Sequence, residues 1–193
     1  MKTINIIGSL IILFLLGCSA VQESNVSPPA VTVGEVAAES NVEAAPVVTK
    51  DDWRDAVFKD INSGGTFQIR DFAGKKILLE SFAVWCPVCT KQQNVFKTMR
   101  AGGDDSIVHI SIDTDPNEDE TIVQRHTADQ GFDWIYAISP AQATRSLIDE
   151  FGISVVNAPS APVILICEDQ TARLLGRGVK DAEEINEEVA AGC

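Results

Sequence analysis

The alternation of apolar and polar positions predicts strands and helices that follow one another from about residue 49 to the C-terminus. Apolar runs short enough for buried strands occupy residues 76–84 and 107–112. The predicted strands are residues 66–72, 76–84, 107–112, 134–138, 163–167 and 172–176, and the predicted helices are residues 53–61, 90–100, 117–130, 140–151 and 181–191. Strands that alternate with helices imply parallel pairing through crossovers, and the last three elements imply a hairpin and a closing helix.

The first 48 residues lack this alternation and fall into two parts. Residues 1–17 contain Lys2 and an apolar run at positions 6–16, which is shorter than the ~20 residues of a membrane span, so we predict a signal peptide. Residues 19–48 mix Pro, Ser, Ala, Val and Glu without an aromatic residue or a sustained period. Such a composition cannot bury enough surface to order itself, and we predict a disordered tether over residues 18–48.

The end of the apolar run, LLGC at positions 15–18, resembles the lipobox of exported lipoproteins. The resemblance implies that Cys18 receives a lipid and becomes the mature N-terminus, which anchors the chain in a membrane. The alternative is an ordinary signal peptide whose cysteine is incidental. Both interpretations place residues 49–193, a single folded domain, outside the cytoplasm, in the periplasm or at the cell surface, where disulfides persist.

Composition excludes several classes of function. The 193 residues carry 28 acidic and 15 basic side chains, for a formal net charge of −13. Nucleic acids and anionic lipid surfaces select clustered Lys and Arg, and the sequence has no such cluster, so we expect no nucleic-acid partner. Five cysteines are too few for a small disulfide framework. We expect a monomeric globular protein in which each cysteine is interpreted from its neighbours.

Two cysteines follow the apolar run 76–84 within the sequence WCPVC, residues 85–89. At the start of a helix, a spacing of three places Cys86 and Cys89 on one face, within reach of a disulfide. Pro87 suits the first turn, where its missing N–H has no partner. The positive end of the helix favours the ionised thiol of Cys86, which is therefore the expected nucleophile. Cys89, one turn deeper and less exposed, is expected to resolve the mixed disulfide with the substrate.

The segment KKILLESFAVWCPVCTKQQNVF, together with the later APVILI, resembles the thioredoxin-like superfamily, and within it the membrane-tethered or secreted thiol-disulfide oxidoreductases of the TlpA/ResA type. The resemblance covers about residues 67–189. It implies a three-layer α/β/α fold with a mixed central sheet, in which a parallel βαβ half precedes a hairpin and a helix. It also implies protein thiol or disulfide substrates, a redox partner that resets the dithiol, no dissociable cofactor, and a reducing direction of electron flow.

The same resemblance assigns the substrate groove. Pro162 would be the cis-proline that faces the two cysteines and leaves neighbouring backbone free to pair with an extended substrate. Ala161 precedes it, and Trp85 and Pro87 flank the cysteines, so these three residues are also expected to contact the substrate. Pro159 is the rival to Pro162, because NAPSAPV contains two Ala-Pro steps. A simple strand start is the alternative role for Pro162.

Glu80 interrupts an otherwise apolar strand six residues before Cys86. A buried carboxylate is costly without a task or a partner. The resemblance implies that Glu80 lies behind the buried Cys89 and accepts its proton, with a pKa raised by desolvation. The alternative is a glutamate at the strand end that reaches solvent.

Cys167 and Cys193 are the remaining thiols of the predicted domain. If the strand 163–167 leaves the active site and the helix 181–191 returns along it, both cover about 16 Å and both cysteines reach the same end. A structural disulfide that encloses 25 residues is then one expectation. A buried free Cys167 with a frayed Cys193 is the other.

No metal site is expected. His109 and His126 are the only histidines, and neither has the spacing of a ligand pair. The acidic residues between 113 and 119 resemble the first half of a calcium loop, but Glu118 stands where the loop needs Gly and Gln124 where it needs Glu. We interpret this segment as a helix cap and a solvated loop.

Two functions from other classes remain open. A copper(I) chaperone would use the softness of the Cys86 and Cys89 sulfurs instead of redox exchange. A binding module would present the groove and the tether to a partner without any chemistry. The leading prediction is a lipid-anchored thiol-disulfide oxidoreductase.

Overall fold

Five strands of the folded domain form a mixed sheet. The structure is a computed structural model that describes residues 52–103 and 106–193. The strands are β3 (Lys76–Phe82), β4 (Ile107–Asp113), β5 (Ile135–Ile138), β6 (Val163–Ile166) and β7 (Ala172–Leu174), in the spatial order β5-β4-β3-β6-β7. The pairs β3/β4 and β4/β5 are parallel, whereas β6 runs antiparallel to β3 and β7 antiparallel to β6. The predicted parallel half and C-terminal hairpin are confirmed.

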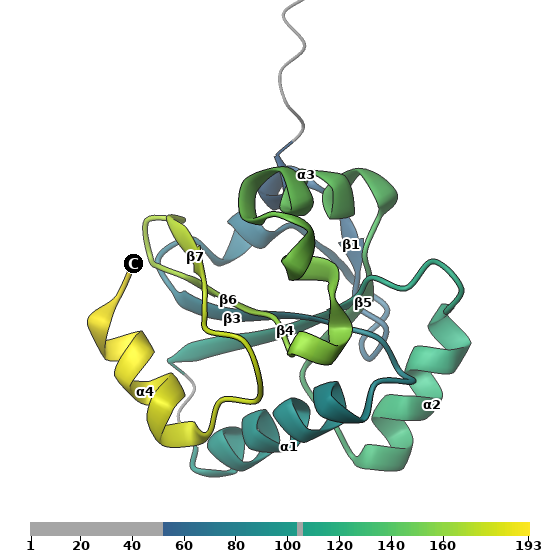
Figure 1. Cartoon of the computed structure of the whole chain (residues 1–193). Helices are drawn as coiled ribbons and strands as arrows, with labels where there is room; N and C mark the ends of the chain where they lie inside the picture. The colour runs from purple at the N-terminus through teal and green to yellow at the C-terminus, as the bar shows by residue number, and fades with distance from the viewer. Residues whose placement is uncertain (1–51, 104–105) are drawn as a thin grey trace, which may run out of the picture. The chain divides into compact units, whose positions relative to one another are not determined.

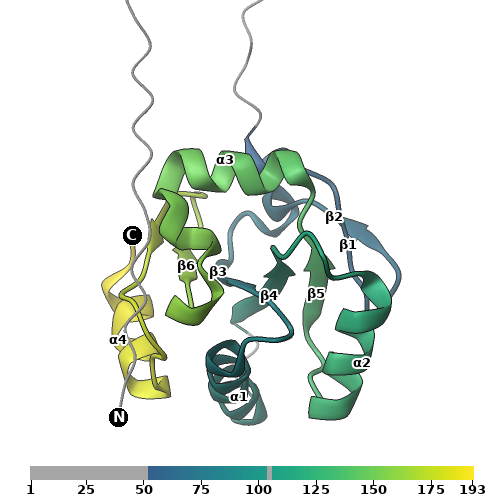
Figure 2. The ribbon, with the colours of Figure 1, turned by 45° about the vertical axis from the view of Figure 1, so that its right-hand side comes forward.

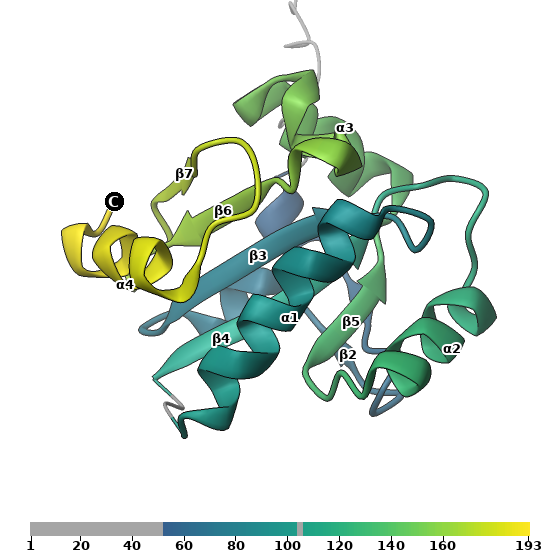
Figure 3. The same cartoon turned by 60° about the horizontal axis from the view of Figure 1, so that its bottom comes forward.

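Helices cover both faces of this sheet (Figure 1). They are α1 (Pro87–Ala101), α2 (Glu120–Gln130), α3 (Ala141–Phe151) and α4 (Ala182–Ala191). Helix α3 lies on one face and α1 on the other, with α4 and α2 on either side of α1 (Figure 2). Figure 3 shows α1 in front of β3 and β4, in the middle of its layer. This is the predicted three-layer α/β/α fold.

Strand β3 supplies side chains to both cores, because successive residues of a strand point to opposite faces of a sheet. Ile77 and Leu79 join the buried cluster on the α3 side, whereas Leu78 and Phe82 join the cluster on the α1 side. All four side chains are fully buried. Glu80 is two residues from both Leu78 and Phe82 and therefore lies on the same face of the strand, so its carboxyl group points to the α1 side.

Capping residues fix where two of the helices begin. Asp119 caps α2, and its carboxylate accepts a hydrogen bond from Ile122 N at 2.9 Å. This cap explains why α2 begins at Glu120 instead of at residue 117. Asp181 caps α4, and Asp181 N donates in return to Glu184 Oε2 at 2.8 Å.

The helix predicted for residues 53–61 is wrong. This segment contains the 3₁₀ turn Trp53–Asp55 and strand β1 (Phe58–Lys59), which pairs antiparallel with β2 (Thr66–Phe67). Contacts with α3 determine the conformation of this segment. Trp53 N donates a hydrogen bond to Ser146 Oγ at 3.1 Å, and the Trp53 indole donates one to Glu150 Oε2 at 2.8 Å. The apolar residues of this segment are buried in a turn and in a strand, and not along one face of a helix.

Short 3₁₀ turns occur at three other places. The strand predicted over residues 66–72 ends at Phe67, and the chain continues as the turn Ile69–Phe72. The connection between α3 and β6 contains the turns Ile153–Val156 and Ala158–Ser160. The last of these turns brings Ala158 to the cysteines at the start of α1.

Residues 1–51, with the predicted signal peptide, the tether and Cys18, lie outside the described residues. Among the helices that the structure does describe, none has the length and the apolar character needed to cross a membrane.

Candidate active site

The two cysteines of the WCPVC sequence meet at the start of α1. Cys86 is the N-cap of the helix, and its Sγ accepts a hydrogen bond from Cys89 N at 3.2 Å. The two Sγ atoms are 2.7 Å apart, so a small movement would bring them to the ~2.05 Å bond of a disulfide. Pro87 occupies the first position of α1, where a missing N–H costs nothing. This pair can therefore interconvert between a dithiol and a disulfide.

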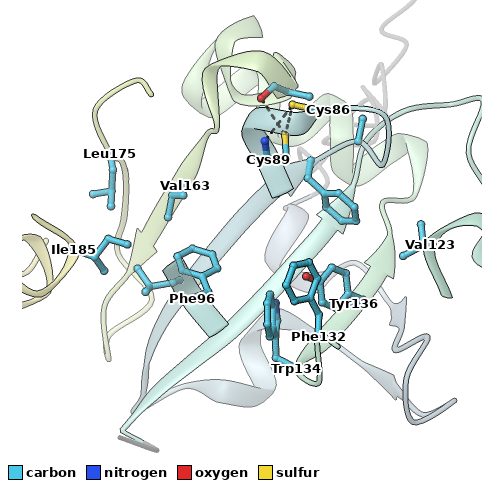
Figure 4. Packing of buried hydrophobic residues seen from close by; sticks show 14 of the residues in the cluster. Cys86, Cys89, Phe96, Val123, Phe132, Trp134, Tyr136, Val163, Leu175 and Ile185 are labelled. Carbon is cyan, nitrogen blue, oxygen red and sulfur yellow. Dashed lines mark hydrogen bonds between the residues drawn. The ribbon is translucent and has the colours of Figure 1, made fainter. Parts of the chain in front are cut away.

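Both sulfurs are buried to the same extent. Cys86 and Cys89 are each 1% exposed and belong to the apolar cluster on the α1 side of the sheet (Figure 4). The expectation that Cys89 is the less exposed of the two is therefore wrong. The reason is the turn Ala158–Ser160, which packs against the start of α1 and contributes Ala158 to the same cluster.

The thiol of Cys89 is held in its neutral form. Its Sγ donates a hydrogen bond to Ala158 O at 3.1 Å. Burial raises the pKa of the Cys89 thiol above its usual value, and the hydrogen bond with Cys86 and the charge of Glu80 raise it further. Because the thiolate is the nucleophile, Cys89 needs a base to remove its proton before it can attack.

Glu80 is the buried carboxyl group whose charge raises the pKa of this thiol. It lies in β3 between Ser111 of β4 and Val163 of β6, and its side chain does not reach solvent. Ser111 Oγ donates a hydrogen bond to Glu80 Oε2 at 2.9 Å. Burial raises the pKa of Glu80 to about 8, although Ser111, Gln93 and the charge of Lys180 act in the opposite direction. This carboxyl group can therefore gain or lose a proton near neutral pH.

Polar side chains that the sequence analysis missed surround Glu80. Ser111 Oγ also accepts a hydrogen bond from Trp134 Nε1 at 3.0 Å. Gln93, on the buried side of α1, shares a hydrogen bond of 2.8 Å with His126 Nε2. The only signal in the sequence is the position of Gln93, which follows Cys89 by four residues and therefore lies on the same helix face.

Lys180 is a second charged group buried near this site. It lies between β7 and α4 and is only 6% exposed. Its Nζ donates to Ala161 O at 2.7 Å and to Gly178 O at 2.5 Å, while its backbone N donates to Gln92 Oε1 at 2.8 Å. No signal in the sequence identifies Lys180, because lysine residues are almost always on the surface.

Acidic side chains hold the turn that precedes α1. Glu118 Oε2 accepts a hydrogen bond from Val84 N at 2.7 Å, and Glu118 Oε1 accepts one from Trp85 N at 3.3 Å. Asp115 Oδ2 accepts a hydrogen bond from Trp85 Nε1 at 2.6 Å. The interpretation of residues 113–119 as a helix cap and solvated loop is correct for Asp119, the N-cap of α2. Asp115 and Glu118 are partly exposed residues of the loop, and they also anchor the active-site turn.

The same acidic segment begins in the core. Asp113, the last residue of β4, is fully buried, and burial raises the pKa of its carboxyl group to about 8.

Among the described residues, no group of three or more His, Cys, Asp or Glu side chains is placed to hold a metal ion. His109 packs edge-on against the Phe96 ring with 5.1 Å between the centroids, and burial lowers the pKa of His126.

A pocket of about 260 Å³ opens beside the cysteines, next to Trp85, which is 58% exposed. Its apolar lining comes from Trp85, Pro116, Val156, Ala158 and Pro159. The polar part of the wall includes Asp115 and Asn157. This pocket can accept a side chain of a polypeptide that lies across the start of α1.

The two prolines of NAPSAPV occupy different places. Pro159 lines the pocket, and the residue before it contacts Cys89 Sγ. Pro162 lies just before β6, where its carbonyl oxygen accepts a hydrogen bond from Ser81 N at 3.2 Å. Ala161 has a φ of 44°, in the left-handed region that residues other than glycine rarely adopt. The structure thus brings the Ala158-Pro159 step to the thiols and places Pro162 at the start of the strand.

Cys167 and Cys193 form a disulfide with a Cα–Cα distance of 5.9 Å. Cys167 follows β6 at the end opposite to Pro162, and Cys193 follows α4. The two cysteines are therefore not part of the active site.

Comparisons with known proteins give a family and a fold. A family model described as Redoxin matches residues 41–190 of the chain. No curated protein matches the chain.

Solved structures share the fold of the described domain. A secreted Mycobacterium tuberculosis disulfide oxidoreductase homologous to E. coli DsbE has 17% identity and a TM-score of 0.53, over 72% of this chain and 97% of that one. A thiol:disulfide interchange protein of the thioredoxin family from Chlorobium tepidum has 17% identity and a TM-score of 0.56, over 71% and 92%. The exposed lipoprotein thioredoxin of Streptococcus pneumoniae has 14% identity and a TM-score of 0.57, over 70% and 98%. At these identities the likeness shows the fold, which is thioredoxin-like.

Proposed function

The chain belongs to the Redoxin family and has a thioredoxin-like fold, and we propose that it is a thiol-disulfide oxidoreductase in which Cys86 and Cys89 carry the reaction with protein substrates. The observation that supports this proposal is the pair of Sγ atoms 2.7 Å apart at the start of α1. Glu80 on the same side of β3 supplies the group that takes up a proton.

The reaction transfers two electrons in two steps. The Cys86 thiolate attacks a substrate disulfide, an S–S bond to the first substrate sulfur forms, and the second substrate sulfur leaves and takes up a proton. Cys89 then gives its proton to Glu80 and attacks Cys86 Sγ, which releases the first substrate sulfur as a thiol. The protein ends as the Cys86–Cys89 disulfide and the substrate as two thiols. A redox partner must reduce the disulfide before the next cycle.

Substrate binding uses the surface around the pocket. An extended segment of the substrate would lie beside Trp85, with one side chain in the pocket that Pro159 lines. The Ala161-Pro162 step shapes the wall behind it, since Lys180 and Ser81 fix the two carbonyl oxygens of this step. Pro87 keeps the helix start rigid next to the reacting sulfur.

The proposed direction is reductive. The resemblance of the WCPVC segment to the TlpA/ResA type supports this direction. Reducing and oxidising members of the superfamily differ in the relative stability of the thiolate and the disulfide, and the reduction potential reports that difference. Equilibration with glutathione measures the potential, and a value close to that of strong oxidants would exclude the reductive direction.

The proposed location is outside the cytoplasm, with Cys18 as a lipid anchor, residues 1–17 as a signal peptide and residues 18–48 as the tether of a domain over residues 49–193. The lipobox-like sequence supports the anchor. Solved relatives described as secreted and as an exposed lipoprotein support the location. We further propose that the domain acts as a monomer.

Insulin reduction by the full chain, purified in detergent, tests the proposed reaction. Cys86→Ser is expected to lower the rate about 100-fold or more, because Cys86 is the proposed attacking sulfur and the raised pKa of Cys89 keeps that thiol protonated. Cys89→Ser is expected to accumulate a mixed disulfide with the substrate, which mass spectrometry detects. The matched control replaces Cys167 and Cys193 together, and this variant should retain the rate. Full insulin reduction by the Cys86→Ser variant would show that Cys86 is not the attacking sulfur, whereas full function of this variant in cells, without insulin reduction, would favour a binding module.

A further inference from the structure

Lys180 is buried although its position offers an easy route to solvent. It directly precedes Asp181, the N-cap of α4, and most residues in this connection are on the surface. A cation near the N-terminus of a helix opposes the positive end of the helix dipole, and burial removes its hydration. Burial also lowers the pKa of Lys180, which shows that the local environment disfavours its charge. A lysine that is held at such a cost has compensating contacts.

The contacts of Lys180 lead to the resolving cysteine. Its Nζ donates to Ala161 O at 2.7 Å. Ala161 N donates to Ala158 O at 2.8 Å, and the same Ala158 oxygen accepts the hydrogen bond from Cys89 Sγ at 3.1 Å. Because Ala161 has the unfavourable φ of 44°, it needs an external contact to hold this conformation. Lys180 provides that contact, so one ammonium group fixes the turn that touches Cys89.

The charge of Lys180 also acts on Glu80. The groups that face the Glu80 carboxyl come from every element around it: Ser111 from β4, Gln93 and Cys89 from α1, Tyr136 from β5 and Lys180 from the β7–α4 connection. Among these groups, Lys180 is the only cation, and it favours the ionised carboxylate. Ser111 Oγ donates a hydrogen bond to Glu80 Oε2 at 2.9 Å, but neither Ser111 nor Gln93 carries a charge.

We propose that Lys180 is a positioning residue of the exchange reaction, because its buried ammonium group holds the Ala158–Ala161 turn against Cys89 and is the cation among the groups around the Glu80 carboxyl. The inference rests on the proposed function of Cys86, Cys89 and Glu80. It adds that the resolving step depends on a residue more than 90 positions away from Cys89 in the sequence. No substrate contact is assigned to Lys180.

The direction of the expected effect follows from the proton transfer. Glu80 accepts the proton of Cys89 only when it is ionised, so the rate of the resolving step rises with pH as Glu80 loses its own proton. Without the positive charge of Lys180, Glu80 ionises at higher pH, and the midpoint of the rate profile rises by about one pH unit or more. A shift of one unit lowers the ionised fraction, and therefore the rate at pH 7, about tenfold.

A stopped-flow measurement with an aromatic disulfide such as 5,5′-dithiobis(2-nitrobenzoate) isolates this step. The reduced full chain should release two equivalents of thionitrobenzoate from the active-site pair, and the second release, whose rate is independent of reagent concentration, reports the attack by Cys89. Lys180→Met and Lys180→Gln should both raise the pH midpoint of the second release. Lys180→Arg keeps the charge and should keep the midpoint. Gln can still donate to Ala161 O, so it separates the charge from the hydrogen bond.

Two controls distinguish the possible failures. Lys76→Met removes another lysine whose Nζ donates to a backbone carbonyl, that of Val189 at 2.8 Å, and should leave the midpoint unchanged. In a Glu80→Gln background, Lys180→Gln should no longer shift the midpoint. A folded Lys180→Gln variant with the wild-type midpoint would overturn the inference. A wild-type chain that releases only one equivalent from the active-site pair would instead overturn the proposed function itself.

Discussion

Glu80 makes the stability of the folded chain depend on pH. Its pKa is raised from 4.5 to about 8 by burial, so between these values an unfolded chain releases the proton while the folded chain keeps it. The unfolded state is then favoured as pH rises. The contribution of Glu80 to stability is complete below pH 4.5 and is lost as pH rises through about 8. This cost in stability falls on the residue that is the base in the proposed reaction.

The variant Glu80→Gln tests this cost, because an amide does not ionise. The free energy of unfolding of the wild type should decrease when the pH is raised from 5 to 8. In the variant, we expect this decrease to be smaller by on the order of 3 kcal/mol. Urea denaturation at the two pH values, with both proteins in the same redox state, measures the difference. Glu187→Gln, on the exposed side of α4, is the matched control. Its free energy of unfolding should decrease between pH 5 and 8 by as much as that of the wild type. An equal fall in the Glu80 variant would mean that Glu80 ionises normally.

Spacing within one short segment predicted Cys86 and Cys89, and the resemblance to the thioredoxin-like superfamily implied that Glu80, on the strand before them, lies behind Cys89. Lys180 and Glu118 escaped prediction for the opposite reason. Each comes from a separate element, and only the packed fold brings it to the active site. The sequence has no periodic pattern that links Lys180 or Glu118 to the turn that it contacts, because residue and turn are far apart along the chain.

At the scale of elements, the bounds of a helix or strand could be predicted where its apolar pattern was long. Strands β3 and β4 and helices α1 and α3 lie within about three residues of their predicted bounds, since each has a long apolar run or a well-defined helical segment. The segment from Trp53 to Lys59 forms a 3₁₀ turn and a two-residue strand instead of a helix. Its conformation depends on contacts with α3, and local propensity is too weak to override them.

The contact between this N-terminal segment and α3 yields a prediction. Glu150 accepts hydrogen bonds from the Trp53 indole at 2.8 Å and from Arg54 Nη2 at 2.7 Å. Glu150→Ala leaves both donors without this acceptor and should lower the free energy of unfolding by about 1–3 kcal/mol, which chemical denaturation measures. The control Glu187→Ala removes an exposed glutamate of α4 and should change it by less than about 0.5 kcal/mol. Equal effects would show that the segment does not dock through Glu150.

At the scale of the whole domain, the C-terminal hairpin and α4 close the sheet and complete the active site. Strand β6 pairs with β3 beside Glu80, and the connection from β7 to α4 carries Lys180. Arg173 of β7 donates to Gly192 O at 2.8 Å and to Glu188 O at 2.9 Å, so the end of α4 is bound to the hairpin. The Cys167–Cys193 disulfide joins the same two elements covalently.

The disulfide and the dithiol should therefore have separable effects. Replacing Cys167 and Cys193 by serine opens a loop with a sequence separation of 26 residues, which should lower the free energy of unfolding by about 3 kcal/mol through the entropy of the unfolded chain. Urea unfolding followed by tryptophan fluorescence measures this loss. Below the unfolding transition, the equilibrium of Cys86 and Cys89 with glutathione should stay at its wild-type value, because the disulfide lies at the other end of β6. A shifted equilibrium in the folded variant would mean that the C-terminal bond controls the redox pair through the position of α4 and Lys180.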